Sequence, residues 1–339
     1  MAHVSSRPLV ALIAAAAVGL TLSSCGKSSA AGSGGSTGQT QVAYLSASSA
    51  NTWLASSKKA MDAVAAANHI KLTEFDAQFK PGEQSRQIQD ILASGKYKGI
   101  VIASVDGAGI IPDLQNAISQ KLQVAILNQI VGTKLDTPDP QFAGPAVSVL
   151  APPLTSGKRM GELALRACQG VSPCRVVYFY GIKGTPIDTA LRQGFDSVVS
   201  QNPAIKVVAE AEGKYLGPDT ALKATQDVLQ KTPDFDVVVG ADQSIQGAQL
   251  ALQDAGKAGR VKLIGLGGST PAIESIKSGA WFGDVFGAPR TEGRLAMEAL
   301  VKALKDGTRT GGVDADTTLP DDALVTRANV DKFTPQWAG

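Results

Sequence analysis

The sequence is poor in the side chains that build most metal and catalytic centres. It has two histidines and three cysteines among 339 residues, and one of each, His3 and Cys25, lies within the first 25 positions. So few residues of these types exclude a histidine-based metal cage, a histidine relay and a multi-cysteine zinc site. We therefore expect neither a metal nor a cofactor.

An excess of charge of either sign is also lacking. The 32 basic and 30 acidic side chains leave a net charge of +2. This balance gives no bulk attraction for nucleic acid or for an anionic membrane surface, so we expect no nucleic-acid partner. With 44% apolar residues and about 150 residues per domain, the length indicates two domains with real hydrophobic cores.

Catalytic motifs are missing as well. The sequence contains no H-E-x-x-H, no P-loop and no G-x-S-x-G after a predicted strand. His69 follows a predicted helix and suits a capping or surface role. Asp106 and Asp242 are either an acid/base pair or helix caps. The glycine-rich run 265–270 is either an anion-binding nest or a tight loop, and its lack of lysine favours the loop. The sequence thus predicts a protein that is not an enzyme.

The first forty residues have the composition of an export signal and a tether. Arg7 precedes an uncharged run, 9–22, which is shorter than the roughly 20 residues that span a bilayer and is typical of a secretory signal. The segment Leu-Ser-Ser-Cys at 22–25 resembles the lipobox of bacterial lipoproteins, in which Cys25 would carry the lipid. The alternative is an ordinary signal peptide with an incidental cysteine. We predict a signal peptide at 1–24, a flexible Gly/Ser tether at 25–40 and a location outside the cytoplasm, anchored to the outer face of the cell membrane.

The other two cysteines, Cys168 and Cys174, are separated by five residues between a predicted helix and a predicted strand. Outside the cytosol such a close pair most simply forms a disulfide. The alternatives are two free thiols or a two-ligand metal site.

From residue 41 onward, apolar strands alternate with amphipathic helices. The predicted strands 99–104 and 236–241 contain the continuous apolar runs 99–103 and 237–241, which is typical of parallel strands covered on both faces. Residues 136–153 are rich in proline and predicted to be irregular. The alternation predicts an α/β fold with doubly wound parallel sheets and right-handed crossovers.

The sequence also carries an internal echo. Residues 98–127 and 235–264 both read strand, loop with an aspartate, helix and strand, with Asp106 and Asp242 in the same place. This predicts two similar lobes with a ligand cleft between them, beyond the carboxyl ends of the strands. Trp53, Tyr215 and Phe286 lie at or near predicted strand ends, where an aromatic face suits a ring or a nonpolar ligand face. Trp53 alternatively packs on the start of its own helix.

Several long segments of the sequence resemble one family of binding proteins. Residues 41 to about 310 resemble the periplasmic sugar-binding proteins of the ribose-binding type, which are related to the sensor domains of LacI-type repressors. The segments that carry it include YLSASSANTWLASSKKAMDAVAAA, YGIKGTPIDTALRQGFDSV and VVVGADQSIQGAQLALQDAG. The resemblance implies a monomeric solute-binding component of an ABC importer, with ABC permease subunits and a small-molecule ligand, a sugar or polyol, as partners.

The resemblance also implies hinge-linked lobes at 41–149 plus 288–318 and at 150–287 plus 319–337. A ligand-binding sensor subunit of a membrane signalling system would use the same fold and remains an alternative. A transcription repressor is excluded by the signal peptide and by the missing helix-turn-helix.

The family's ligand-binding positions can be followed along this sequence. Where the family has an Asp-Arg pair that grips sugar hydroxyls, this chain has Asn128 and Gln129, and the family's Asp and Gln elsewhere become Gly267 and Gly287. The candidate ligand-binding residues are Ser46, Asn51, Trp53, Asp106, Asn128, Gln129, Asp188, Thr189, Tyr215, Asp242, Gln243 and Phe286.

The lack of these charged hydrogen-bonding side chains limits how polar the ligand can be. Charge-assisted hydrogen bonds are about twice as strong as neutral ones, so a free hexose would bind poorly without them. We expect a ligand less polar than a free hexose, or a larger one that uses the room left by Gly267 and Gly287. A methylated or reduced sugar, a small polyol or a nonsugar cyclic compound would suit.

Overall fold

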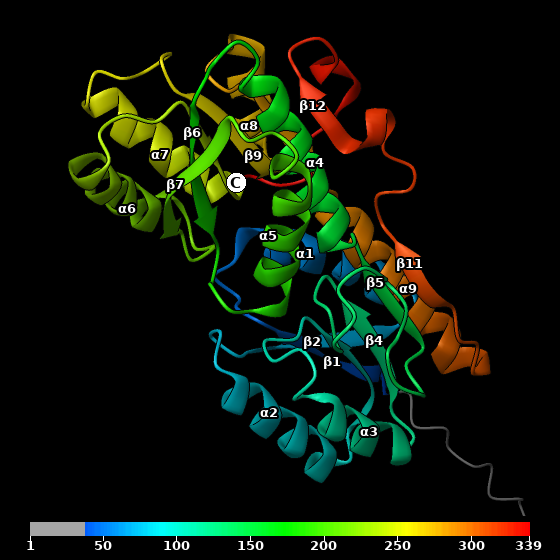
Figure 1. Ribbon diagram of the computed structural model, residues 1–339. Coiled ribbons are helices and arrows are strands. Elements are labelled where there is room, and N and C mark those ends of the chain that lie inside the picture. The colour runs from blue at the N-terminus through cyan, green and yellow to red at the C-terminus, as the bar shows by residue number, and fades with distance from the viewer. Residues whose placement is uncertain (1–37) are drawn as a thin grey trace, which may run out of the picture. The chain divides into compact units, whose positions relative to one another are not determined.

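The computed structural model describes residues 38–339, so the predicted signal peptide, Cys25 and most of the tether lie outside the described residues. Within 38–339 no helix is both long enough and apolar enough to cross a membrane. The described chain forms two six-stranded sheets with helices packed on them (Figure 1).

The first sheet has the strand order β11-β5-β4-β3-β1-β2, and every pairing in it is parallel. Its strands are β1 (Thr40–Ser46), β2 (Ile70–Asp76), β3 (Tyr97–Ile102), β4 (Gln123–Leu127), β5 (Val147–Leu150) and β11 (Gly311–Asp314).

The second sheet has the corresponding order, β12-β10-β9-β8-β6-β7, and only its edge pairing of β10 with β12 is antiparallel. Its strands are β6 (Cys174–Tyr180), β7 (Ile205–Glu212), β8 (Val237–Val239), β9 (Lys262–Gly267), β10 (Gly283–Phe286) and β12 (Leu324–Thr326). The matching order confirms the predicted fold of two similar doubly wound lobes with parallel sheets.

Helices cover both faces of each sheet (Figure 1). On the first sheet, α1 and α9 cover one face and α2 and α3 the other, and on the second, α4 and α5 cover one face and α6, α7 and α8 the other. Their bounds are α1 (Thr52–Ala67), α2 (Pro81–Ser94), α3 (Ile111–Ser119), α4 (Pro153–Ala167), α5 (Pro186–Val199), α6 (Pro218–Lys231), α7 (Asp242–Asp254), α8 (Thr270–Ser278) and α9 (Pro289–Asp306), with 3₁₀ turns η1 (Pro320–Ala323) and η2 (Val330–Lys332) near the end.

The continuous apolar runs follow from this covering. In β3, Val101 packs in the cluster beneath α1 and α9, whereas Ile100 and Ile102 pack beneath α2 and α3. Successive side chains of a strand point to opposite faces, so a strand buried on both faces needs an apolar residue at every position.

Two strands lie where the sequence predicts none. β5 falls inside the stretch 136–153, which is predicted to be irregular because of its prolines, and β11 begins with Gly311 and Gly312. Both are four residues long and they pair with each other at the edge of the first sheet. Neighbouring strands supply the hydrogen bonds that local propensity does not indicate.

The predicted disulfide is present. Cys168, at the end of α4, is bonded to Cys174, the first residue of β6. Both cysteines are buried in the cluster formed by α4, α5 and the second sheet.

Candidate functional site

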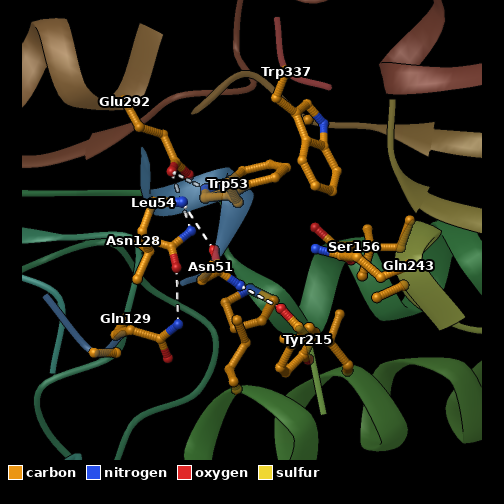
Figure 2. Close-up of a pocket in the computed structure, with 18 of the residues that line it drawn as sticks. Asn51, Trp53, Leu54, Asn128, Gln129, Ser156, Tyr215, Gln243, Glu292 and Trp337 are labelled. Atoms are coloured by element: carbon orange, nitrogen blue, oxygen red, sulfur yellow. Dashed lines mark hydrogen bonds between the residues drawn. The ribbon is translucent and has the colours of Figure 1, made fainter. Parts of the chain in front are cut away.

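A cavity of about 120 Å³ lies beyond the carboxyl ends of strands from both sheets (Figure 2). Its walls include residues that follow β1, β4, β5, β8, β10 and β11, together with Leu266 of β9. Ligands of open parallel sheets bind beyond the carboxyl ends of the strands. This position makes the cavity the candidate ligand site.

Asn51 lines the cavity at the start of α1. Its Oδ1 accepts a hydrogen bond from the backbone N–H of Leu54 at 2.9 Å, so it caps the helix. Its Nδ2 donates to the backbone oxygen of Tyr215 at 2.9 Å, which ties the segment after β1 to the segment after β7. Both ends of the Asn51 amide are therefore engaged in positioning the walls.

Trp53 is the second residue of the same helix and presents its ring to the cavity (Figure 2). Its Nε1 donates to Oε2 of Glu292 at 3.1 Å. Its ring meets that of Trp337 edge to face, with centroids 5.4 Å apart. Since its polar atom is already bonded, Trp53 offers a ligand only nonpolar surface.

Glu292, in the first turn of α9, is the acid that Trp53 contacts, and only 1% of its surface is exposed. Its Oε2 also accepts from Nδ2 of Asn128 at 3.1 Å. Burial raises the pKa of Glu292 to about 8, and the charge of Asp316 adds to the rise, while the bonds from Trp53 and Asn128 oppose it. The carboxyl is therefore mostly neutral at pH 7 and carries a proton that it can donate.

Asn128 and Gln129 follow β4 and line the same side of the cavity. Nε2 of Gln129 donates to Oδ1 of Asn128 at 2.8 Å, so the amides and Glu292 form one chain of hydrogen bonds. Asn128 has a φ of +63°, a left-handed conformation that asparagine tolerates better than most residues.

Asp316 lines the cavity after β11 and forms a buried ion pair. Its Oδ2 lies 2.6 Å from Nη1 of Arg159, whose Nη2 binds Asp322 at 2.7 Å. Burial raises the pKa of Asp316 to about 6 despite the charge of Arg159. Within residues 38–339, Oδ1 of Asp316 has no hydrogen-bond partner, so it is a free acceptor at the wall.

Tyr215 lines the cavity, and its hydroxyl donates to Asp188 at 3.1 Å. Asp188 itself lies outside the lining, where it accepts hydrogen bonds from the backbone N–H groups of Gly181 and Ile182. Burial raises the pKa of Asp188, although these bonds act to lower it. Thr189 is half-buried on α5 and also lies outside the lining.

Gln243 lines the cavity at the start of α7, but its neighbour Asp242 lies behind the wall. Oδ2 of Asp242 accepts from the backbone N–H of Ser269, and Asp284 accepts from that of Gly268. In the glycine-rich run 265–270, the backbone N–H groups of Gly268 and Ser269 are therefore bonded to protein carboxylates, as expected for a tight loop rather than for an anion-binding nest.

Of the three remaining candidate ligand-binding residues, one lines the cavity and two lie outside its lining. Phe286, at the end of β10, lines the cavity. Ser46 is fully buried at the end of β1 and donates to the backbone of Phe75, outside the lining. Asp106 is exposed and outside the lining, unlike Asp242, so the two aspartates of the internal echo occupy different environments.

The room beside Gly267 and Gly287 is not open to a larger ligand. A Cβ on Gly267 would lie 2.6 Å from the ring of Trp337, and one on Gly287 would lie 2.2 Å from the ring of Trp53. The expectation that a larger ligand uses this room is therefore wrong. Two indoles fill the positions where the family resemblance implies polar side chains.

Sequence reasoning missed several residues of the wall. These are Phe79, Ser156, Glu292, Asp316 and Trp337, among others. Glu292 reads in the sequence as an ordinary acid in the first turn of a helix, where acids are favoured. The one available hint is Gly293, because a glycine inside a helix often marks a close helix contact that buries its neighbours.

Comparison with known proteins agrees with this geometry. Residues 42–309 match the model of the family described as periplasmic binding protein domain. The chain is 26% identical over 296 residues to the xylitol-binding protein of Mycolicibacterium smegmatis, covering 86% of this chain and 80% of that one. It is 25% identical over 251 residues to the ribose import binding protein RbsB of Bacillus subtilis, covering 74% and 76%.

Solved structures show the same likeness. An ABC transporter solute binding protein from Mycobacterium smegmatis with bound glycerol superposes with a TM-score of 0.76 and 25% identity, covering 89% of this chain and all of that one. The family match extends over most of the chain and over both sheets. The chain belongs to the periplasmic binding protein family, whose members are extracytoplasmic solute-binding proteins and not enzymes.

Proposed function

We propose that this protein is the lipid-anchored solute-binding component of an ABC importer, and that it binds a sugar-like or polyol ligand less polar than a free hexose. The observation that carries the ligand class is the pair of indoles, Trp53 and Trp337, in the spaces beside Gly287 and Gly267. The two indoles place nonpolar surface where the family resemblance implies polar side chains that bind sugar hydroxyls. The similarity to a xylitol-binding protein and to a structure with bound glycerol supports a reduced, polyol-like ligand.

The polar side of the cavity sets how such a ligand would be held. Glu292 is a donor, and Oδ1 of Asp316 is a charged acceptor. Asn128 and Gln129 add an amide edge that is bonded to Glu292. A ligand with a few hydroxyls on one edge and C–H groups on the opposite face would meet both kinds of wall.

In this proposal the two lobes close on the ligand about the segments that join the sheets. The chain passes between the sheets after β5, β10 and β11. Hinge closure around a ligand needs only a few such segments to change conformation. The boundaries at 287/288 and 318/319 are retained as part of the proposal. The predicted boundary at 149/150 would cut β5, so the proposal moves it to the end of that strand, after Leu150.

A thermal-shift screen tests the ligand class. The panel should hold xylitol, glycerol, ribose, glucose and galactose. A ligand in 100-fold excess over its dissociation constant stabilises by about 2.7 kcal/mol, which raises the melting temperature measurably. We expect a shift with xylitol, and shifts only with ribose, glucose or galactose would contradict the proposed ligand class.

The role of Trp53 has its own test. Trp53→Ala removes nonpolar ligand surface and the hydrogen bond to Glu292. We expect at least about a tenfold loss of affinity for the ligand found in the screen, or about 1.4 kcal/mol. Isothermal titration calorimetry measures it, and an unchanged dissociation constant would leave Trp53 a structural residue only.

A further inference from the structure

The last residues of the chain return to the cavity. After η2 the chain runs to Gln336 and Trp337 and ends beside α7 and α8 (Figure 1). Trp337 lines the cavity and is only 4% exposed. Hydrogen bonds from several elements hold Gln336 and Trp337 in place.

Gln336 is held by helices of the first sheet. Its backbone oxygen accepts from Oγ of Ser56 in α1 at 2.7 Å and from Nε of Arg290 in α9 at 2.6 Å. Its side-chain Oε1 accepts from the backbone N–H of Thr291, and its Nε2 donates to Oγ1 of Thr291, both at 3.0 Å. These four contacts fix Gln336 to the adjacent starts of α1 and α9.

Trp337 is held by the second sheet and its helices. Its backbone oxygen accepts from the backbone N–H of Thr270, at the start of α8, at 3.0 Å and from the Thr270 hydroxyl at 3.1 Å. Its Nε1 donates to the backbone oxygen of Gly267, the last residue of β9, at 2.7 Å. Two consecutive residues are thus bonded to elements of different sheets.

Gly267 is shaped for this indole. Its φ of +149° disfavours other residues, and a Cβ there would strike the ring at 2.6 Å. Trp53 stands against Trp337 at an interplanar angle of 72°, in room that Gly287 provides (Figure 2). Both indole N–H groups already donate to protein oxygens, so the corner between the rings offers nonpolar surface alone.

We infer that the C-terminal segment Gln336–Trp337 is part of the ligand site: Trp337 and Trp53 form a two-indole corner that receives the C–H face of the ligand. Gln336 fixes this corner to the helices of the first sheet, and Trp337 fixes it to the second sheet. This inference rests on the proposed function, and it adds that the segment after η2 determines ligand specificity. Carbohydrate and polyol C–H groups pack on aromatic faces by dispersion and by the loss of apolar hydration.

Matched truncations test the inference by calorimetry with xylitol as the probe. A chain that ends after Pro335 loses both residues, whereas a chain that ends after Trp337 loses only Ala338 and Gly339. We expect the first to bind xylitol at least about tenfold more weakly and the second within about twofold of the full chain. Trp337→Phe keeps part of the nonpolar surface and should fall between them. Equal affinity of both truncations would overturn the inference.

A measurement on the unaltered protein covers the case in which a shortened chain fails to fold. The sequence has three tryptophans, so a ¹H–¹⁵N spectrum shows three indole N–H signals from Trp53, Trp281 and Trp337. Trp281 is buried in the core beneath α7 and α8 and serves as the internal control. We expect saturating xylitol to shift the signals of Trp53 and Trp337 more than that of Trp281.

The outcomes separate the two proposals. A shift of Trp53 without Trp337 would overturn the role of the chain end and leave the proposed function standing. If xylitol and the sugars of the panel shift no indole signal and give no heat of binding, the proposed function fails, and the role of the chain end fails with it.

Discussion

Glu292 shows how a single buried side chain sets the chemistry of the cavity. Two donors, Trp53 and Asn128, both reach its Oε2. The backbone N–H of Ala151 is a third donor to this carboxyl, and burial still keeps the acid mostly neutral at pH 7. A neutral acid can donate to a ligand hydroxyl without the desolvation cost of a second charge beside Asp316.

The pH dependence of ligand affinity tests this role. The side chains that face Glu292 are Trp53 from α1, Asn128 after β4 and Asp316 after β11, which pairs with Arg159 of α4. The backbone N–H of Ala151 and the buried Tyr44 of β1, whose pKa is raised well above its usual value, also interact with it. Because the pKa of Glu292 is about 8, the donor is present at pH 7 and is lost as the pH rises through about 8. We expect ligand affinity to be steady up to about pH 7 and to fall above about pH 8.

Glu292→Gln is the matched variant, because it keeps a donor and an acceptor and cannot ionise. We expect it to bind within a few-fold of the natural protein at about pH 7, with no fall above about pH 8. Calorimetric titrations of both proteins across this range measure the difference. A fall of equal size in the variant would assign the pH dependence to another group.

Asp242 and Asp284 form a second buried acidic pair behind the wall. A Cβ on Gly265 would lie 2.6 Å from Oδ1 of Asp242 and 2.0 Å from Oδ2 of Asp284, so both oxygens face the same point. Within the described residues neither of these oxygens has a donor, and one proton shared between them would satisfy both. Burial raises the pKa of each, with Asp284 well above its usual value because the charge of Asp242 adds to the effect.

This pair predicts that stability falls as the pH rises. The folded pKa of Asp284 is raised, so its contribution to stability is fully present below the unfolded value of about 4 and is lost as the pH rises through the folded value. Asp284→Asn keeps a donor to Asp242 without the titration. We expect the variant to gain stability relative to the natural protein between about pH 5 and pH 9, as measured by urea unfolding. Parallel stability profiles for the two proteins would contradict the shared proton.

At the scale of elements, the close contact of α1 and α9 brings the site together. Gly293 makes this possible, since a Cβ there would lie 2.2 Å from the backbone oxygen of Ser57 in α1. The contact places Trp53 of α1 against Glu292 of α9. Helix packing therefore determines the geometry of the polar and nonpolar walls at the same time.

Gly293→Ala should force the two helices apart. Although alanine favours helix by about 1 kcal/mol over glycine, overpacking against backbone typically costs about 1–3 kcal/mol, and the neighbouring oxygen belongs to the main chain. We expect a net loss of stability and weaker ligand binding. Gly82→Ala in α2 is the control, because no atom lies within 4 Å of the new Cβ, and it should be neutral or stabilising by up to about 1 kcal/mol. Thermal unfolding compares the two, and equal melting temperatures would refute the packing argument.

Most of the helices and strands can be predicted from the sequence, but two strands cannot. Continuous apolar runs and helical periodicity locate most strands and helices, because burial on both faces leaves a strong pattern. Periodicity cannot locate β5 and β11, whose four-residue strands depend on their neighbours for hydrogen bonds.

In the site, residues at strand ends are predictable, and Asn51, Trp53 and Asn128 line the cavity for this reason. Asp316 and Trp337 lie in the irregular segments after β11 and η2, and nothing local in the sequence brings them to the cavity.

At the scale of the whole molecule, the two sheets repeat one strand order, as the internal echo predicts. The candidate site lies where the carboxyl ends of both sets of strands face one cavity. The scarcity of histidine and cysteine agrees with this arrangement, because a site that only binds and releases a solute needs no nucleophile or metal.

The proposed anchor is tested on the full-length chain in cells. Cys25→Ser removes the sulfur that would carry the lipid. Because a variant whose signal is not cleaved keeps the apolar run 9–22, lipid incorporation and not membrane association is the readout. We expect the natural protein to incorporate labelled palmitate and the variant to incorporate none. Incorporation by the variant equal to that of the natural protein would contradict lipid anchoring at Cys25.

Calorimetric titration with xylitol, ribose, glucose and galactose tests most directly the proposal that Trp53 and Trp337 give the cavity nonpolar surface in place of polar contacts to a sugar. We predict saturable binding of xylitol, with ribose, glucose and galactose weaker by at least about tenfold, or 1.4 kcal/mol. Micromolar binding of ribose, glucose or galactose, equal to or tighter than that of xylitol, would contradict it.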